Sequence, residues 1–298
     1  MDPWLLIIGI FFTFFLIVGT VGNTIMILAF IKSTKLRTIC HFLIANLCFA
    51  DLLHSLSHVP NVLTIFSGWE IRQASCFYLQ ATFLAGAVSS SPICFLLGLD
   101  RFLAIAYPFY YQQLQRWRTK TLLLYSLFPI LYTILLLYSS YSTRSYEHVR
   151  LCAVPTALNP YAFSILNLSF IAIQALACCL YFVSWYLLRK KTVEKTFRRI
   201  FKSILITVFL IIFGWLTTGL VNLATFLWIP DSYTRTIIQM FAGFFVNTSL
   251  CTNVFVYYHR NTEYREAIRA VLFKEKVSSR MNSAQQEPML NSNNSSSV

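Results

Sequence analysis

Three charged side chains stand within otherwise uncharged apolar runs of this sequence: Asp51, Asp100 and Arg101. A charge near the centre of a lipid bilayer costs roughly 2.5–3.5 kcal/mol, so a residue that keeps one at depth is a candidate for function. Asp100 and Arg101 are neighbours near the end of their run, where they can pair or reach the interface. Asp51 lies mid-run and has no Lys or Arg in its own run to pair with. It must therefore be protonated, held by hydroxyls and amides, or bound to a cation.

Seven apolar runs must position these groups. The chain has 298 residues, of which 57% are hydrophobic and 12% charged, and soluble domains carry roughly twice that charged fraction. Each run reaches about the 20 residues that a helix needs to span a bilayer, and helices satisfy their own backbone groups in lipid. We expect an all-α membrane protein, a seven-transmembrane helix bundle with spans near Trp4–Ile31, His41–Phe66, Ala74–Tyr107, Thr121–Tyr141, Tyr161–Leu188, Ser203–Ile229 and Thr236–Tyr258.

The distribution of Lys and Arg predicts the orientation of the bundle. Of the 24 basic residues, 20 fall on the same side, in alternate connections and the C-terminal tail. The positive-inside bias places that side in the cytoplasm and the N-terminus outside. The net charge of +13 is explained by this topology and by attraction to anionic lipid of the inner leaflet, so it does not indicate a nucleic-acid partner.

Two of the eight cysteines, Cys76 and Cys152, fall on the predicted outer side. Thiols in an oxidising compartment are expected to pair, although two free cysteines remain the alternative. The other six lie within the spans or at their inner ends.

Several motifs resemble those of rhodopsin-like G-protein-coupled receptors. Gly22-Asn23 resembles the GN pair of the first helix, the segment 44–51 resembles LAxxD, and the segment 100–102 stands for DRY. Cys76 precedes Arg101 by 25 residues, which is the family's spacing between its disulfide cysteine and its DRY arginine. Within the family, the segment 32–54 resembles nematode serpentine chemoreceptors of class sx.

Two motifs depart from the family pattern. The sixth helix reads FGWLT over 213–217 where the family has CWxP, and the seventh reads NVFVY over 253–257 where the family has NPxxY. Trp215 is kept in the first and both prolines are lost. Bends in these helices must therefore come from glycine, small residues or inserted water.

The resemblance implies a switch at the cytoplasmic side. Asp100 would hold Arg101 at rest, and on activation Arg101 would move toward Tyr181 and Tyr257 and accept a heterotrimeric G protein. Phe109 would pack into the Gα surface. Basic residues of the third inner connection would add contacts to the G protein, or serve topology alone: Lys190, Lys191, Lys195, Arg198 and Arg199.

The resemblance also implies a polar core and a ligand cavity. Asp51, Ser90 and Asn253 match the family's sodium pocket, with Asn23 nearby; a water-filled polar network without an ion is the alternative, and no other cofactor is expected. The ligand cavity would have Trp215 at its floor and the following positions on its wall: Phe83, Leu84, Ala87, Asn222 and Asn247. Phe83 stands where amine receptors carry Asp, so a small neutral molecule or part of a peptide is favoured as ligand. The absence of lysine between 202 and 274 excludes a retinal Schiff base.

We expect a receptor domain over 1–273 that ends in a short amphipathic helix near 261–273, followed by a disordered cytoplasmic tail, 274–298. The plasma membrane, in sensory cilia if the receptor is chemosensory, is the predicted location. Arrestin and a receptor kinase are further partners implied by the resemblance.

A neuropeptide receptor is the alternative function within the superfamily, and a channel or transporter is a more remote alternative. An intramembrane enzyme is not expected, because Asp51 is the single deep acid. His54 and His58 share a helical face, but two imidazoles make a weak metal signal.

Overall fold

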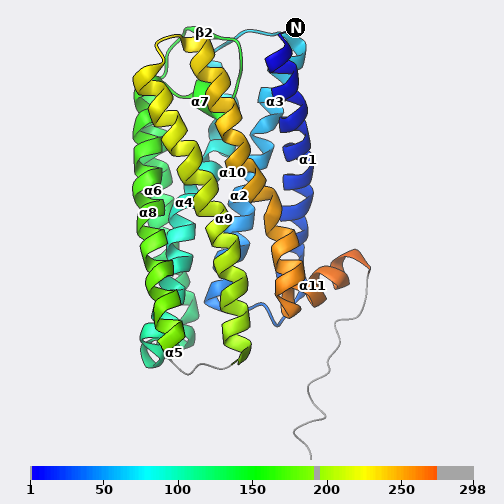
Figure 1. Cartoon of the computed structure of the whole chain (residues 1–298), viewed down its shortest axis with the longest axis vertical. Helices are drawn as coiled ribbons and strands as arrows, with labels where there is room; N and C mark the ends of the chain where they lie inside the picture. The colour runs from blue at the N-terminus through cyan, green and yellow to red at the C-terminus, as the bar shows by residue number, and fades with distance from the viewer. Residues whose placement is uncertain (1, 191–194, 274–298) are drawn as a thin grey trace, which may run out of the picture.

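The long helices of the chain begin and end close to the limits of the apolar runs. The computed structural model describes residues 2–190 and 195–273, in which seven helices are long and apolar enough to cross a membrane. They stand side by side as one bundle (Figure 1), which confirms the predicted fold class. The helices of the described residues, short ones included, are α1 (Pro3–Lys32), α2 (Ile39–Leu56), α3 (His58–Ser67), α4 (Gln73–Ala106), α5 (Pro108–Arg116), α6 (Arg118–Ser142), α7 (Val154–Ala157), α8 (Pro160–Lys190), α9 (Lys195–Trp228), α10 (Ser232–Arg260) and α11 (Thr262–Leu272). Helices α2 and α3 together form one of the seven spans.

Local sequence sets several helix ends. Asp2 caps α1 by accepting a hydrogen bond from the backbone N–H of Trp4 at 2.9 Å, and Pro3 follows at the first helical position. Asp231 caps α10 through the N–H of Thr234, and Asn261 caps α11. Side-chain oxygens at these positions satisfy N–H groups that have no partner within the helix.

The second predicted span is broken into two helices, which differs from the single helix expected over 41–66. Pro60 lies in the first turn of α3 and has no backbone N–H to donate to the carbonyl of Leu56. The chain turns at Ser57, whose N–H contacts the carbonyls of both Leu53 and His54. Beyond the break, α3 packs beside α1.

Two glycines allow close approach between neighbouring helices. A Cβ added at Gly86 on α4 would lie 2.4 Å from Cβ of Leu53 on α2. A Cβ added at Gly214 on α9 would lie 2.8 Å from the carbonyl oxygen of Phe245 on α10. Small residues at such contacts let helix backbones pack closely in membrane bundles.

The end of the bundle that carries the N-terminus is covered by a loop that a disulfide holds in place. We call this end of the bundle the disulfide end. Cys76 and Cys152 are joined by a disulfide, as predicted. Strand β1 (Ile71–Arg72) pairs antiparallel with β2 (His148–Val149), with Ile71 opposite Val149. Nε2 of Gln80 donates to the carbonyl of Cys152 at 3.0 Å. These links hold the segment before α8 across the helix ends.

The opposite end, which we call the basic end, carries α5 and α11 (Figure 1). Helix α11 matches the predicted amphipathic helix near 261–273, and it buries Tyr264 and Ile268 against the bundle. Helix α5 was not predicted. The tail 274–298 and Lys191 lie outside the described residues, as do the side chains of Lys195, Arg198 and Arg199.

Candidate functional site

Asp51 lies at the centre of a polar cluster that joins three helices. Its side chain is fully buried on α2. Oδ1 accepts a hydrogen bond from Oγ of Ser90 on α4 at 3.1 Å, and Oδ2 accepts one from Nδ2 of Asn253 on α10 at 2.8 Å. The structure thus brings together three of the four residues predicted for the polar core.

Asn23 serves the same region without touching the carboxylate. Its Nδ2 donates to the carbonyl of Gly19 at 3.0 Å and to the carbonyl of Leu250 at 3.5 Å, which ties α1 to α10. Oδ1 of Asn253 is buried and makes no hydrogen bond within the described part of the chain. Carboxylate, hydroxyl and amide oxygens are the hard ligands that suit alkali and alkaline-earth cations, so the cluster fits a small cation.

The second charged group lies at the basic end of α4. Asp100 and Arg101 are 0% and 5% exposed. Nε of Arg101 donates to Oδ2 of Asp100 at 3.0 Å, and Nη2 contacts the same oxygen. Both charges are thus removed from water and paired, and breaking such a buried pair by removing one partner typically costs 3–5 kcal/mol.

A tyrosine of α5 completes this ion pair. Oη of Tyr111 accepts from Nη2 of Arg101 at 2.8 Å and donates to Oδ2 of Asp100 at 3.3 Å. Nε2 of Gln115 donates to the same hydroxyl at 2.7 Å. Burial raises the pKa of Tyr111 well above its ordinary value, so the phenol keeps its proton at neutral pH. We call Asp100, Arg101 and Tyr111 the latch. Tyr111 was not predicted from the sequence, where its one signal was the aromatic run that follows Pro108.

Three other predicted switch residues are two buried tyrosines and one exposed phenylalanine. Tyr181 on α8 is buried, and its ring lies against Gly98, one helical turn before Arg101. Tyr257 on α10 is buried, with its ring centroid 4.8 Å from that of Tyr264. Phe109 is 83% exposed at the basic end. A large apolar side chain this exposed beside a membrane is available to a partner.

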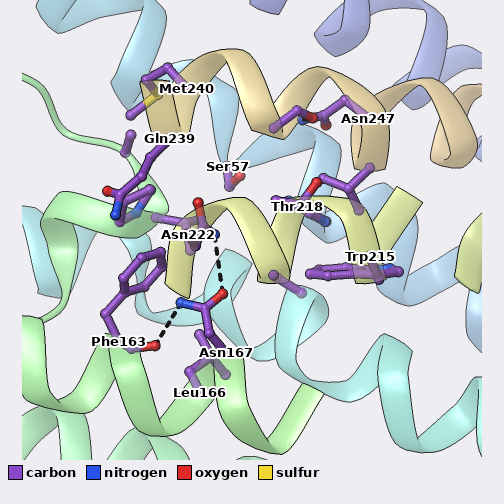
Figure 2. Close-up of a pocket in the computed structure, with 18 of the residues that line it drawn as sticks. Ser57, Phe163, Leu166, Asn167, Trp215, Thr218, Asn222, Gln239, Met240 and Asn247 are labelled. Atoms are coloured by element: carbon purple, nitrogen blue, oxygen red, sulfur yellow. Dashed lines mark hydrogen bonds between the residues drawn. The ribbon is translucent and has the colours of Figure 1, made fainter. Parts of the chain in front are cut away.

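A cavity opens between the helices toward the disulfide end. Its empty volume, including its opening to solvent, is about 700 Å³. Four predicted positions line it: Ala87, Trp215, Asn222 and Asn247. Figure 2 shows Trp215, Thr218 and Asn222 along one helix, with Asn247 and Gln239 on the next.

Phe83 and Leu84 do not line this cavity, contrary to the prediction. Ala153 and the first two residues of α7 also line the cavity, and α4 contributes Ala87 alone. Leu84 is instead fully buried in the main hydrophobic core.

The cavity lining is more polar than the sequence indicated. Nε2 of His58 lies 2.6 Å from Oδ1 of Asn247. Nδ2 of Asn222 donates to Oδ1 of Asn167 at 3.1 Å, so these side chains point toward one another from α9 and α8 (Figure 2). Neither polar atom of the Asn61 side chain finds a hydrogen-bond partner in the described part of the chain. Asp, Glu, Lys and Arg are absent from the lining residues that the structure describes.

His54 and His58, which were expected to share a helical face, both line the cavity. Their ring centroids are 5.8 Å apart. Within the described residues no group of three or more His, Cys, Asp or Glu side chains gathers that could hold a metal ion. The two imidazoles are therefore part of the polar lining, where neutral rings offer one donor and one acceptor each.

Comparison with known proteins identifies related chains. The family model of the serpentine-type seven-transmembrane chemoreceptor Srsx matches residues 16–272. An allatostatin-A receptor of Bombyx mori is 34% identical over 104 residues, which cover 34% of this chain and 29% of that protein. Galanin receptor type 2 of Homo sapiens is 30% identical over 115 residues, covering 38% and 30%. Olfactory receptor 5M1 of Homo sapiens is 32% identical over 114 residues, covering 37% and 36%. Each match thus spans about a third of the curated relative.

Proposed function

Because this chain belongs to the Srsx family of serpentine-type seven-transmembrane G-protein-coupled chemoreceptors, we propose that it carries a signal from a small molecule to a heterotrimeric G protein. The observation that carries the proposal is the division of α4 between two sites. Ala87 lines the cavity and Arg101 belongs to the latch. The separation of fourteen positions along the chain corresponds to about 21 Å of helix, so a single helix contributes to both sites.

The cavity favours an uncharged ligand with both hydrogen-bond donors and acceptors. A charged ligand would enter a lining with no counter-charge, and an unpaired buried charge is costly. A neutral ligand could satisfy the amide of Asn61, which otherwise lacks a protein partner. Trp215 supplies an apolar floor, with its ring 4.8 Å from that of Phe170 in an edge-to-face contact. Small ligand sites commonly combine apolar walls with a few such polar groups.

The latch supplies the second half of the mechanism. Ligand-driven movement of α4 or α9 would separate Arg101 from Asp100 and turn it toward Tyr181 and Tyr257. Arg suits this exchange because its planar guanidinium stays charged and offers several donors to carboxylates and carbonyls. The exposed ring of Phe109 lies at the same end and would pack against the Gα subunit.

The proposed setting is the plasma membrane, with the disulfide end outside and the basic end in the cytoplasm. The disulfide and the Lys and Arg distribution support this orientation. Sensory cilia are the proposed subcellular location. Phosphorylation of the serine-rich tail, 274–298, by a receptor kinase and capture by arrestin are proposed by analogy with related receptors.

Sodium is the proposed occupant of the Asp51 cluster. The three oxygen-bearing side chains of Asp51, Ser90 and Asn253 would hold it, and its charge would balance the buried carboxylate. Such an ion would favour the helix arrangement in which α2, α4 and α10 converge.

The function is tested by screening neutral volatile and water-soluble compounds in cells that carry reporters for several Gα classes. A compound that activates the receptor should fail to do so in Arg101→Ala. The matched control is Arg189→Ala, which removes an exposed arginine from the same end of the bundle. A response that survives in Arg101→Ala at full size would remove the latch from the mechanism.

A neuropeptide receptor is the second candidate. Matches to receptors named for allatostatin-A and galanin favour it. Residues 153–155 at the start of α7, which form part of the cavity wall, favour a small ligand instead. Activation by peptides and by no small neutral compound would decide for this candidate. A channel or transporter would instead show ion or solute flux through the purified protein in liposomes without a G protein.

A further inference from the structure

We infer that the basic end holds a specific site for an anionic phospholipid of the adjoining membrane leaflet. A hollow lies between the loop that joins α1 to α2 and the junction of α5 and α6. We call it the basic cup. It is lined by four cations and four further residues: Arg37, Arg116, Arg118, Lys120, Thr38, Gln115, Trp117 and Thr119.

The cations of the basic cup are not neutralised by the protein. In the described part of the chain no carboxylate forms an ion pair with any of them, whereas Lys35 nearby pairs with Glu266 at 3.0 Å. Arg37 donates to the backbone carbonyl of Ile31 at 2.9 Å, and Arg118 donates to the carbonyl of Arg37. These bonds hold the guanidinium groups in place without cancelling their charge. Four unpaired cations in one hollow therefore favour a ligand with more than one negative charge, such as a phosphorylated headgroup.

The basic cup continues into an apolar groove on the outer face of the bundle. The groove is lined by Phe30, Phe42, Leu122 and Leu123, together with Arg37, Arg118 and Thr119, which belong to both hollows. Leu123 is 66% exposed and belongs to a membrane-spanning helix, so this groove faces hydrocarbon. A ligand that fills both hollows must be polyanionic at one end and apolar at the other. A phospholipid has this form, and a soluble anion would leave the groove empty.

The cup also touches the latch. Gln115 lines the cup, and its Nε2 donates to the hydroxyl of Tyr111 at 2.7 Å. A headgroup phosphate that accepts the Gln115 amide would take this donor away from Tyr111. Lipid in the cup would therefore loosen the latch and raise basal signalling. This consequence rests on the proposed function and orientation, but lipid binding itself does not require a G protein or a receptor ligand.

Binding can be measured by native mass spectrometry of the purified full-length receptor in detergent. The added probes are phosphatidylinositol bisphosphate, phosphatidylserine, phosphatidylcholine and the soluble headgroup inositol trisphosphate. The test variant combines Arg116→Gln and Lys120→Gln, because neither side chain donates a hydrogen bond that the structure records. The matched control combines Arg189→Gln and Lys190→Gln, which removes two exposed cations from the last turn of α8, at the same end of the bundle.

We expect the test variant to bind phosphatidylinositol bisphosphate about tenfold more weakly than wild type, and the control to change by about twofold or less, because each cation at a phosphate supplies a charge-assisted contact. Phosphatidylcholine should show no difference among the three proteins. A second variant, Leu123→Ser, should weaken binding of the lipid and leave binding of inositol trisphosphate unchanged.

Equal losses in the test and control variants would overturn the site, because they would show diffuse charge attraction. Displacement of the lipid by equimolar inositol trisphosphate would overturn the lipid assignment and indicate a site for free phosphate. Neither result would touch the proposed signalling function, whose test uses ligand and Gα reporters. A failure there would likewise leave the lipid measurement intact.

Discussion

Replacing Tyr111 by Phe removes one hydroxyl from the latch and leaves its ion pair in place. That hydroxyl contacts Arg101 at 2.8 Å and Asp100 at 3.3 Å. A hydrogen bond to a charged group contributes roughly 1.5–3 kcal/mol. At the lower figure, the loss of these contacts shifts the balance between latched and released receptor by about tenfold, since 1.4 kcal/mol is a factor of ten. If about 1% of the receptor is released at rest, about 10% is released in the variant.

The assay is nucleotide exchange on purified G proteins by reconstituted receptor without ligand. Tyr111→Phe should raise basal exchange in proportion to the released fraction. Tyr110→Phe is the matched control, because Tyr110 is the adjacent residue, 53% exposed, and it has no recorded bond to the latch. Gln115→Leu should raise exchange by less, since it removes only the donor to the hydroxyl. Equal basal rates in Tyr111→Phe and Tyr110→Phe would refute the role of the hydroxyl in holding Arg101.

Three further predictions concern the polar core, the packing and the disulfide. Sodium at ten times its dissociation constant should stabilise wild type by about 1.4 kcal/mol, which raises the melting temperature in NaCl above that in choline chloride. Asp51→Asn should have the same melting temperature in both salts. A difference that persists in the variant would place the ion elsewhere. Gly214→Val should lower the free energy of unfolding, measured by thermal melting, by about 1–3 kcal/mol, because the added side chain meets the Phe245 carbonyl on α10. An unchanged melting temperature would mean that the two helices can move apart without cost. Cys76→Ser should lower the free energy of unfolding by about 2–5 kcal/mol and reduce surface expression. Unchanged melting and expression would show that the loop is held in place without the disulfide.

The proline positions of CWxP in α9 and NPxxY in α10 are occupied here by Thr217 and Val254. Gly214 precedes Trp215 and occupies the cysteine position of CWxP, whereas Thr217 occupies the proline position. The missing Cβ of Gly214 lets α9 approach the backbone of α10. Proline appears instead at Pro60, where it breaks the second span, and at Pro92 and Pro129 inside α4 and α6. The prolines of this bundle are thus distributed differently from those of the two family motifs.

The sequence predicted the candidate site unevenly. The cluster of Asp51, Ser90 and Asn253 was predicted correctly as a contact, because motif spacing assigns each residue to a known face of its helix. Tyr111 was missed, because its contact with Arg101 depends on α5, a helix in a connection that carried no span signal. The polar lining supplied by Asn61 was missed for a related reason, since it depends on the break at Ser57.

The sequence by itself determined that seven helices cross the membrane and which residues can pair through a disulfide. Hydropathy and charge act locally, so each span carries its own signal in about twenty residues. Only the tertiary structure decided which polar side chains share a cavity and which hydroxyl completes the latch. Those contacts depend on the rotation of each helix and on where a loop crosses its end, as the displacement of Phe83 and Leu84 from the cavity shows. Such rotations are set by packing between distant segments, and no short stretch of sequence encodes them.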